Sequence, residues 1–106
     1  MDDILKRLKA FRNARQWTPF HTAENLAKSI AIEASELLEN YQFHTLQPDI
    51  KNVQDELADV MGYCLLLCDH YGFDVETILH QKIDQNEIKY PVDKAFGNAT
   101  KYTKFK

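Results

Sequence analysis

An all-α fold of four helices is predicted by three features of the 106-residue sequence. Apolar residues recur at about the 3.6-residue period of a helix over most of the chain. No segment alternates polar and apolar residues in the manner of a strand. The chain has only three glycines and three prolines, and most of them fall between the periodic segments. We therefore expect a single all-α domain over residues 1–106.

The boundaries of the helices follow from residues that favour helix ends. Thr22 and Asp74 are suitable N-cap residues, because their side-chain oxygens accept hydrogen bonds from free backbone N–H groups. Pro48 suits the first turn of the third helix, and Gly72 suits its C-terminal end. Residues 90–106 form a basic tail with four lysines and one aspartate. The four helices are expected at residues 2–16, 22–41, 48–71 and 74–89.

Composition and charge exclude several classes of protein. A formal net charge of -3 argues against a dedicated binder of duplex DNA. No segment approaches the roughly 20 apolar residues of a membrane span, and residues 1–15 lack the apolar run of a signal peptide. Cys64 and Cys68 are interpreted as small core residues, because neighbouring turns of one helix give a disulfide poor geometry and two thiols alone do not make a zinc site. We expect a cytoplasmic protein without a membrane or a stable nucleic-acid partner.

The third helix is apolar on nearly every side over the segment VMGYCLLLC. Val60 and Cys64 lie on the expected core face, whereas Leu65 and Leu66 point elsewhere. A helix that is apolar all round must be buried all round, and four helices in 106 residues can hardly achieve this alone. We therefore expect a homo-oligomer, a dimer or a dimer of dimers, that completes the bundle.

Carboxylates follow the apolar stripes of the second and third helices. The segment AIEASELLE carries Glu33, Glu36 and Glu39, each three residues after the last. At about 100° per residue, Glu33 and Glu36 fall at the edge of the stripe, and Glu39 turns toward solvent. Glu56 and Asp59 occupy the same edge of the third helix. Four of these carboxylates therefore border the core.

A short loop centred near Leu46 makes the second and third helices antiparallel neighbours. Glu36 lies ten residues before this centre and Glu56 ten after it, while Glu33 and Asp59 lie thirteen before and after it. Equal distances from the turn place side chains at equal heights in an antiparallel hairpin. The four carboxylates are therefore expected to converge on one patch.

Convergent carboxylates repel one another, and a divalent cation removes that penalty. Hard oxygen ligands suit Mg²⁺, with Mn²⁺ as a substitute. A ferritin-like di-iron site would use Glu-x-x-His on two helices, and no histidine stands at that spacing here. The alternative is a solvated acidic edge of an ordinary helical bundle. Two carboxylate pairs at matched heights make this alternative less favoured.

Polar residues interrupt the apolar stripe of the fourth helix. Lys82 and Asn86 stand where core residues belong, and an amide that is buried needs hydrogen-bond partners. Snorkelling of the lysine is the alternative explanation. Arg12 and Arg15 flank the stripe of the first helix and are weaker candidates, because arginines are common near a helix end. Cations beside Mg²⁺-binding carboxylates indicate chemistry on a phosphate ester or anhydride.

Aromatic and imidazole rings near these elements offer flat surfaces for a nucleobase. Trp17 and Phe20 are the best of these candidates, because they lie in the turn before the second helix and outside any apolar stripe. Each of these rings taken alone is more often a core residue. The full set is Trp17, Phe20, His21, Phe43 and Tyr63.

The motifs resemble those of the MazG-like nucleotide pyrophosphohydrolases. IEASE and ELADV, with 19 residues between Glu36 and Glu56, resemble the paired acidic signature of that family. FRNARQWTPFHTAENL resembles its opening segment and KIDQNEIKYPVDKA its closing segment. The similarity covers nearly the whole chain and is greatest to the small single-domain members, including the dCTP pyrophosphatases.

The resemblance implies an all-α oligomer that cleaves a nucleoside triphosphate between the α and β phosphates. It implies Mg²⁺ ligands, phosphate or sugar contacts, and a nucleoside pocket. Glu36, Glu56 and Lys82 are the expected catalytic residues, and Glu36 is the candidate that positions or deprotonates the attacking water. The Mg²⁺ ligands are Glu33, Glu36, Glu56 and Asp59, the phosphate or sugar contacts are Lys82 and Asn86, and the pocket residues are Trp17, His21, Asn25 and Tyr63.

One position departs from the family pattern. Some dCTP-preferring relatives have a second tryptophan after the end of the second helix, where this sequence has Phe43. The base preference therefore stays open, and the expected role is the cleaning of the nucleotide pool. The alternatives are a dUTPase-like or phosphoribosyl-ATP-cleaving relative, and a non-enzymatic helical protein that binds a partner.

Overall fold

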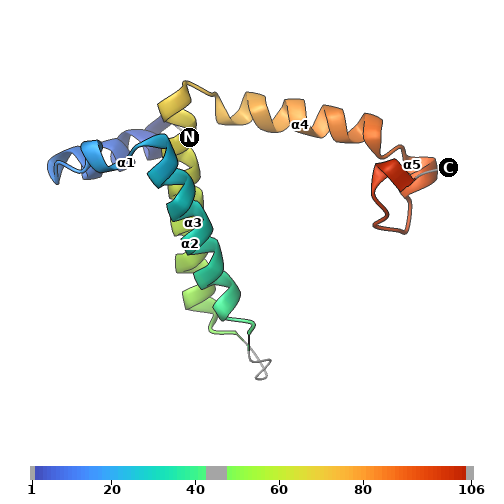
Figure 1. Cartoon of the computed structure of the whole chain (residues 1–106), viewed down its shortest axis with the longest axis horizontal. Helices are drawn as coiled ribbons and strands as arrows, with labels where there is room; N and C mark the ends of the chain where they lie inside the picture. The colour runs from blue at the N-terminus through green and yellow to red at the C-terminus, as the bar shows by residue number, and fades with distance from the viewer. Residues whose placement is uncertain (1, 43–47, 105–106) are drawn as a thin grey trace. The chain divides into compact units, whose positions relative to one another are not determined.

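A computed structural model describes the protein over residues 2–42 and 48–104, and no strand occurs in these ranges. The predicted all-α class is confirmed. The chain divides into two compact units, Met1–Gly72 and Phe73–Lys106. The helices in chain order are α1 (Asp2–Ala14), η1 (Thr18–Phe20), α2 (Ala23–Glu39), α3 (Ile50–Tyr71), α4 (Val75–Lys89), α5 (Val92–Ala95) and η2 (Tyr102–Lys104), where η marks a 3₁₀ turn (Figure 1).

The second unit contains a helix that the sequence patterns did not predict. The single turn α5 follows Pro91, whose fixed φ of -60° favours the start of a helix. Four lysines and few apolar neighbours gave this segment no helical period, so residues 90–106 were expected to be only a tail. The prediction of four helices is therefore too low by one short helix within the described residues.

Two of the predicted N-caps are confirmed, and a third boundary is corrected. The Thr22 hydroxyl accepts a hydrogen bond from the Asn25 N–H at 3.2 Å, and Asp74 caps α4. Gly72 ends α3 with a left-handed φ of 72°. The α3 N-cap is Asp49, so Pro48 precedes the helix and is outside its first turn.

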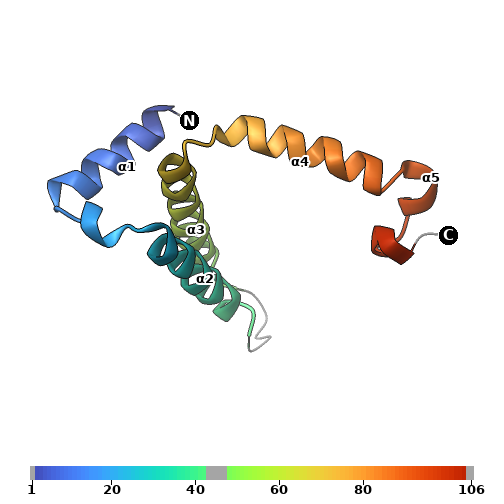
Figure 2. The same ribbon diagram turned by 45° about the horizontal axis from the view of Figure 1, so that its top comes forward.

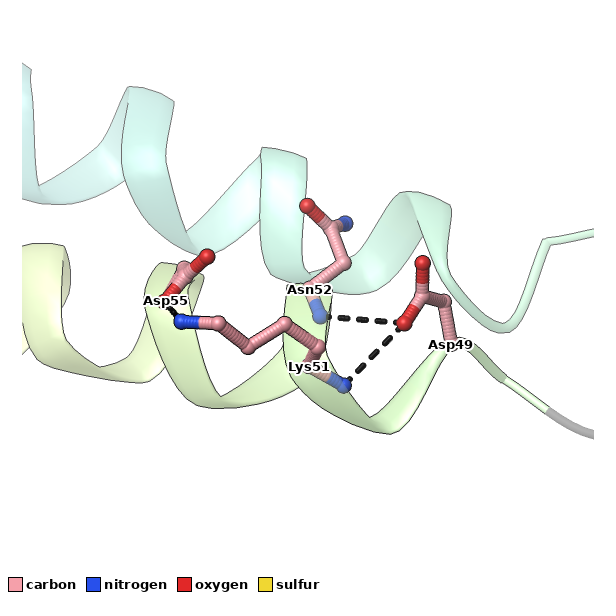
Figure 3. A network of polar contacts seen from close by, with 4 residues as sticks. All are labelled: Asp49, Lys51, Asn52 and Asp55. Atoms are coloured by element: carbon pink, nitrogen blue, oxygen red, sulfur yellow. Dashed lines mark hydrogen bonds and ion pairs between the residues drawn. The ribbon is translucent and has the colours of Figure 1, made fainter.

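Asp49 caps α3 because its carboxylate satisfies two free N–H groups at once. Its Oδ1 accepts from the backbone N–H groups of Lys51 at 3.1 Å and Asn52 at 3.3 Å (Figure 3). Lys51 in turn pairs with Asp55 one turn later, at 2.6 Å between Nζ and Oδ1. Proline offers no side-chain acceptor, which explains why the boundary lies at the aspartate.

The predicted antiparallel hairpin of α2 and α3 is present, with the two helices side by side along most of their length (Figures 1 and 2). The amide of Asn52 at the start of α3 donates to the Asn40 side-chain oxygen at the end of α2, at 2.9 Å. Leu26 of α2 is 2% exposed. The expected loop centre at Leu46 lies outside the described residues.

Helix α1 packs on α3, and the chain then returns through η1 to α2. An ion pair joins Lys9 of α1 to Asp69 of α3 at 3.5 Å. The turn after α1 requires a positive φ of 54° at Gln16, which the structure adopts without a glycine. The 3₁₀ turn then places His21 with its ring centroid 6.3 Å from that of Tyr63 in α3.

Burial in α3 differs from the expectation. Leu65 and Leu66 are 9% and 6% exposed, so the chain itself covers the side chains that were expected to require a partner. Exposed apolar side chains lie elsewhere on the three helices of the first unit. Among them are Ile4, Ile32, Leu38, Leu57 and Met61.

No helix in residues 2–42 and 48–104 combines the length and apolar content that a membrane span requires.

Candidate functional site

Three carboxylates of α2 and α3 meet at the predicted position. One oxygen from each of Glu33, Glu56 and Asp59 can be chosen so that all lie within 4.8 Å of one another. The apolar packing of an antiparallel hairpin brings them together, because Glu33 of α2 then stands level with the second and third turns of α3. The predicted matching of heights about residue 46 is consistent with this arrangement.

Glu36 adjoins this group, as expected. The pKa of the Glu33 carboxyl is raised to about 7. Burial is the largest cause, the neighbouring Glu36 side chain is the next, and Asp59 and Glu56 add to them. Burial and then Glu36 also raise the pKa of Glu56. Burial and the neighbouring acidic groups therefore disfavour the charged forms of Glu33 and Glu56. Glu39 is exposed, as predicted.

Two buried oxygens in this cluster lack hydrogen-bond partners. Oε2 of Glu33 and Oε2 of Glu56 are both buried and accept no hydrogen bond. A buried acceptor without a partner is costly, and a cation coordinated by both oxygens would remove this cost. Carboxylate oxygens of this kind are hard ligands, so the residues fit Mg²⁺ or Mn²⁺.

A hollow of about 150 Å³ adjoins the carboxylate cluster and shares Asp59 with it. A series of rings lines it, with centroid distances of 5.6 Å from Phe11 to Trp17 and 6.4 Å from Trp17 to His21. Its full lining is Leu8, Phe11, Trp17, His21, Ala58, Asp59, Gly62, Tyr63 and Leu66. The structure thus brings three of the four predicted pocket residues together.

Two of the residues that line the hollow, His21 and Tyr63, carry polar side-chain atoms. Nδ1 of His21 is buried without a hydrogen-bond partner, and burial followed by the charge of Arg12 lowers the His21 pKa. The imidazole is therefore held neutral near pH 7, when one ring nitrogen donates and the other accepts. Burial, then the charges of Glu33 and Asp59, raise the Tyr63 pKa, which keeps its hydroxyl protonated.

Asn25 and Phe20 contact each other, and a contact of either residue with the nucleoside stays a prediction. The Asn25 amide donates to the Phe20 backbone oxygen at 3.0 Å, and neither residue lines the hollow. Asn25 therefore supports the turn that carries His21. The backbone N–H of Asn25 also donates to the Thr22 hydroxyl at the start of α2. Both contacts of Asn25 are therefore local.

The other predicted contacts lie outside the first unit or outside the hollow. Lys82 and Asn86 are exposed and one turn apart on α4, in the second unit, and their contacts with a substrate stay predictions. Phe43 lies outside the described residues. Arg15 lies over the Phe11 ring at 3.7 Å, so it packs behind one wall of the hollow.

Sequence reasoning missed the wall that α1 contributes. Leu8 and Phe11 line the hollow, but at their spacing they match an ordinary apolar helix face. No local signal separates a pocket wall from a core stripe. The ring series that continues into Trp17 becomes visible only when α1 is packed on α3.

The fold is all-α, and the site combines a ring-lined hollow with a cluster of carboxylates whose oxygens suit a metal ion. Residues 28–105 match the MazG-like family, and the chain belongs to that family, as its motifs predicted. It is 31% identical to dCTP pyrophosphatase 1 of Rattus norvegicus and 30% identical to that of Homo sapiens, each over 112 residues. These alignments cover 97% of this chain and 66% of each relative.

A solved structure confirms the fold of the family. The chain is similar to a pyrophosphatase from Archaeoglobus fulgidus, with a TM-score of 0.77 and 39% sequence identity. The match covers 86% of this chain and 92% of that chain. The all-α MazG-like fold therefore applies to most of this protein.

The raised pKa of Glu33 predicts a pH-dependent stability in metal-free buffer. Its pKa rises from 4.5 to about 7 on folding, so between these values the folded protein binds more protons than the unfolded chain. The free energy of unfolding should therefore fall as pH increases across this window. Denaturant titrations in chelator should show this fall in wild type and a weaker one in Glu33→Gln. A Glu39→Gln variant should keep the wild-type slope, and identical slopes in all three proteins would contradict the prediction.

Proposed function

We propose that this chain hydrolyses nucleoside triphosphates to the monophosphate and pyrophosphate in a Mg²⁺-dependent reaction. The observation that carries the proposal is the group of Glu33, Glu56 and Asp59 oxygens within 4.8 Å of one another, next to a ring-lined hollow that shares Asp59. Ligands for a cation and a surface for a base thus lie side by side. Membership of the MazG-like family, and similarity to proteins named dCTP pyrophosphatase 1, support the same activity.

The hollow is the proposed site of the base. Trp17 and Tyr63 offer ring faces for stacking, and His21 offers a nitrogen to a polar edge of the base. Asp59 belongs to both the hollow and the carboxylate group, so the phosphates of a base bound in the hollow would lie near the carboxylates. Asn25 acts by supporting the turn beneath His21.

The carboxylates are the proposed metal ligands. Mg²⁺ supplies Lewis-acid stabilisation of phosphate oxygens and lowers the pKa of a bound water. Glu33, Glu56 and Asp59 form the tight group that would hold it, and Glu36 adjoins that group. Glu36 is the proposed proton acceptor for the attacking water, because it stands beside the three-oxygen group and outside it.

The proposed contacts with the phosphates come from α4. Lys82 and Asn86 lie one turn apart on one side of that helix, and both side chains are exposed. A lysine offsets negative charge that develops on a leaving pyrophosphate, and an amide orients a phosphate or sugar oxygen. Removal of unwanted nucleotides from the cellular pool is the proposed role.

A homo-oligomer is proposed to cover the exposed apolar surface of the first unit. Met61 of α3 is 60% exposed, Ile32 of α2 is 57% exposed and Ile4 of α1 is 52% exposed. Large apolar side chains that stay exposed on all three helices favour a covering partner, because burying them removes apolar surface from water. A second copy of the chain presents the same apolar residues, so a symmetric contact would bury both sets.

The activity can be tested with a panel of nucleoside triphosphates in Mg²⁺, with pyrophosphate release as the readout. Glu56→Gln should lower turnover by at least about a hundredfold, because a catalytic metal contributes several factors of ten. In metal-free buffer the variant should be as stable as wild type or more stable, since it removes a repelled charge. Glu39→Gln is the matched control and should keep wild-type turnover. Metal-independent turnover, or none in the wild type, would contradict the proposal.

The role of Lys82 can be tested by Lys82→Met, which keeps the length of the side chain and removes its charge. A well-placed donor typically contributes about 2.7 to 4 kcal/mol to a developing charge, so kcat should fall by roughly a hundredfold or more. Stability should change little because the lysine is exposed. Lys94→Met, at an exposed lysine of α5, is the control. Equal and small effects of both substitutions would remove Lys82 from the site.

Oligomerisation can be tested by Met61→Lys, which places a charge on the exposed apolar face of α3. Sedimentation at micromolar concentration should show a dimer or larger assembly for wild type and a smaller species for the variant. Gln54→Lys, at an exposed polar position of the same helix, should sediment as wild type. A monomeric wild-type protein at this concentration would overturn the proposed homo-oligomer.

A further inference from the structure

Gly62 stands in the interior of α3, where a glycine destabilises a helix. It lies in the thirteenth position of the 22-residue helix Ile50–Tyr71. Glycine in such a position reduces helix stability relative to alanine because it loses more backbone freedom on folding. Some other feature of the structure must therefore account for its place.

The backbone does not require a glycine here. The positive-φ glycines among the described residues are Gly72 and Gly97, and Gly62 is not one of them. Helix packing does not require it either. A Cβ atom built on Gly62 would meet only Cδ2 of Leu8, at 3.7 Å, which is an ordinary van der Waals contact. An alanine would fit between α1 and α3 without moving either helix.

Gly62 does line the hollow beside the carboxylates. Ala58, Gly62 and Leu66 follow one another at intervals of four residues, so they form one face of α3 along this hollow. The two smallest side chains of this face lie nearest Asp59. Any side chain at Gly62 would occupy part of the hollow.

The size of the hollow makes this space significant. Its volume is about 150 Å³, which is comparable to an engineered apolar cavity that binds one benzene ring. The hollow has room for a single six-membered ring, and one added methyl group on the protein side takes part of that volume. The imidazole of His21 also lines the hollow.

We propose that Gly62 is a specificity-determining residue that sets the depth of the base pocket. This inference rests on the proposed nucleotide hydrolysis. The missing side chain leaves room for one methyl-sized group on the ring of the bound base. The lower helix stability of glycine is the cost of that room.

The test compares wild type with Gly62→Ala and Gly62→Leu. The substrates are dCTP, dUTP and dTTP, and the bases of dUTP and dTTP differ by one ring methyl group. Gly62→Ala should melt roughly 2 to 8 °C higher than wild type because alanine favours the helix. It should nevertheless lower the ratio of kcat/KM for dTTP to that for dUTP by at least about tenfold, the typical effect of one methylene in an apolar pocket. Gly62→Leu should lower kcat/KM for dCTP at least about tenfold, because its side chain fills the hollow.

The outcomes separate this inference from the proposed function. If wild type releases pyrophosphate from no triphosphate, the proposed function fails. If wild type is active and Gly62→Ala leaves the dTTP to dUTP ratio unchanged, the Gly62 inference is overturned. If dUTP and dTTP are not substrates, the Gly62→Leu variant provides the test. Full activity of that variant on dCTP overturns the inference. Circular dichroism shows that the variants compared are folded.

Discussion

The antiparallel packing of α2 on α3 is the constraint on which the candidate site depends. Apolar burial at positions such as Leu26 holds the two helices together, and the same register sets Glu33 level with Glu56 and Asp59. A shift of one helical turn would separate the carboxylates by about 5.4 Å. Because the register is set by apolar burial, the carboxylates stay together in spite of their mutual repulsion.

That repulsion is visible in the chemistry of the cluster. The pKa of Glu33 rises to about 7, and one oxygen each of Glu33 and Glu56 is buried without a hydrogen-bond partner. A fold that keeps these groups together without a compensating cation sacrifices stability. Strained electrostatics of this kind are typical of functional sites, where the ligand supplies the missing interaction.

The second part of the site comes from α1 and the turn η1. These segments place Phe11, Trp17 and His21 along the face of α3 that carries Gly62 and Tyr63. Asp59 belongs to both parts, since it lines the hollow and joins the carboxylate cluster. A molecule with an aromatic ring at one end and phosphates at the other matches this arrangement, which is why a nucleotide is the proposed substrate.

The sequence by itself determined the α-helical class, the caps at Thr22 and Asp74, and the pairing of two helices that carry acidic residues, on which the structure groups Glu33, Glu56 and Asp59. Helical period, capping chemistry and loop length are local properties, and they are enough to place side chains on a two-helix hairpin. Tertiary structure alone decided that Leu65 and Leu66 are covered within the chain, that Asn25 supports a turn, and that α1 walls the hollow. The wall of the hollow depends on how α1 and η1 pack against α3, and an apolar helix face has the same pattern whether it meets a core, a partner or a ligand.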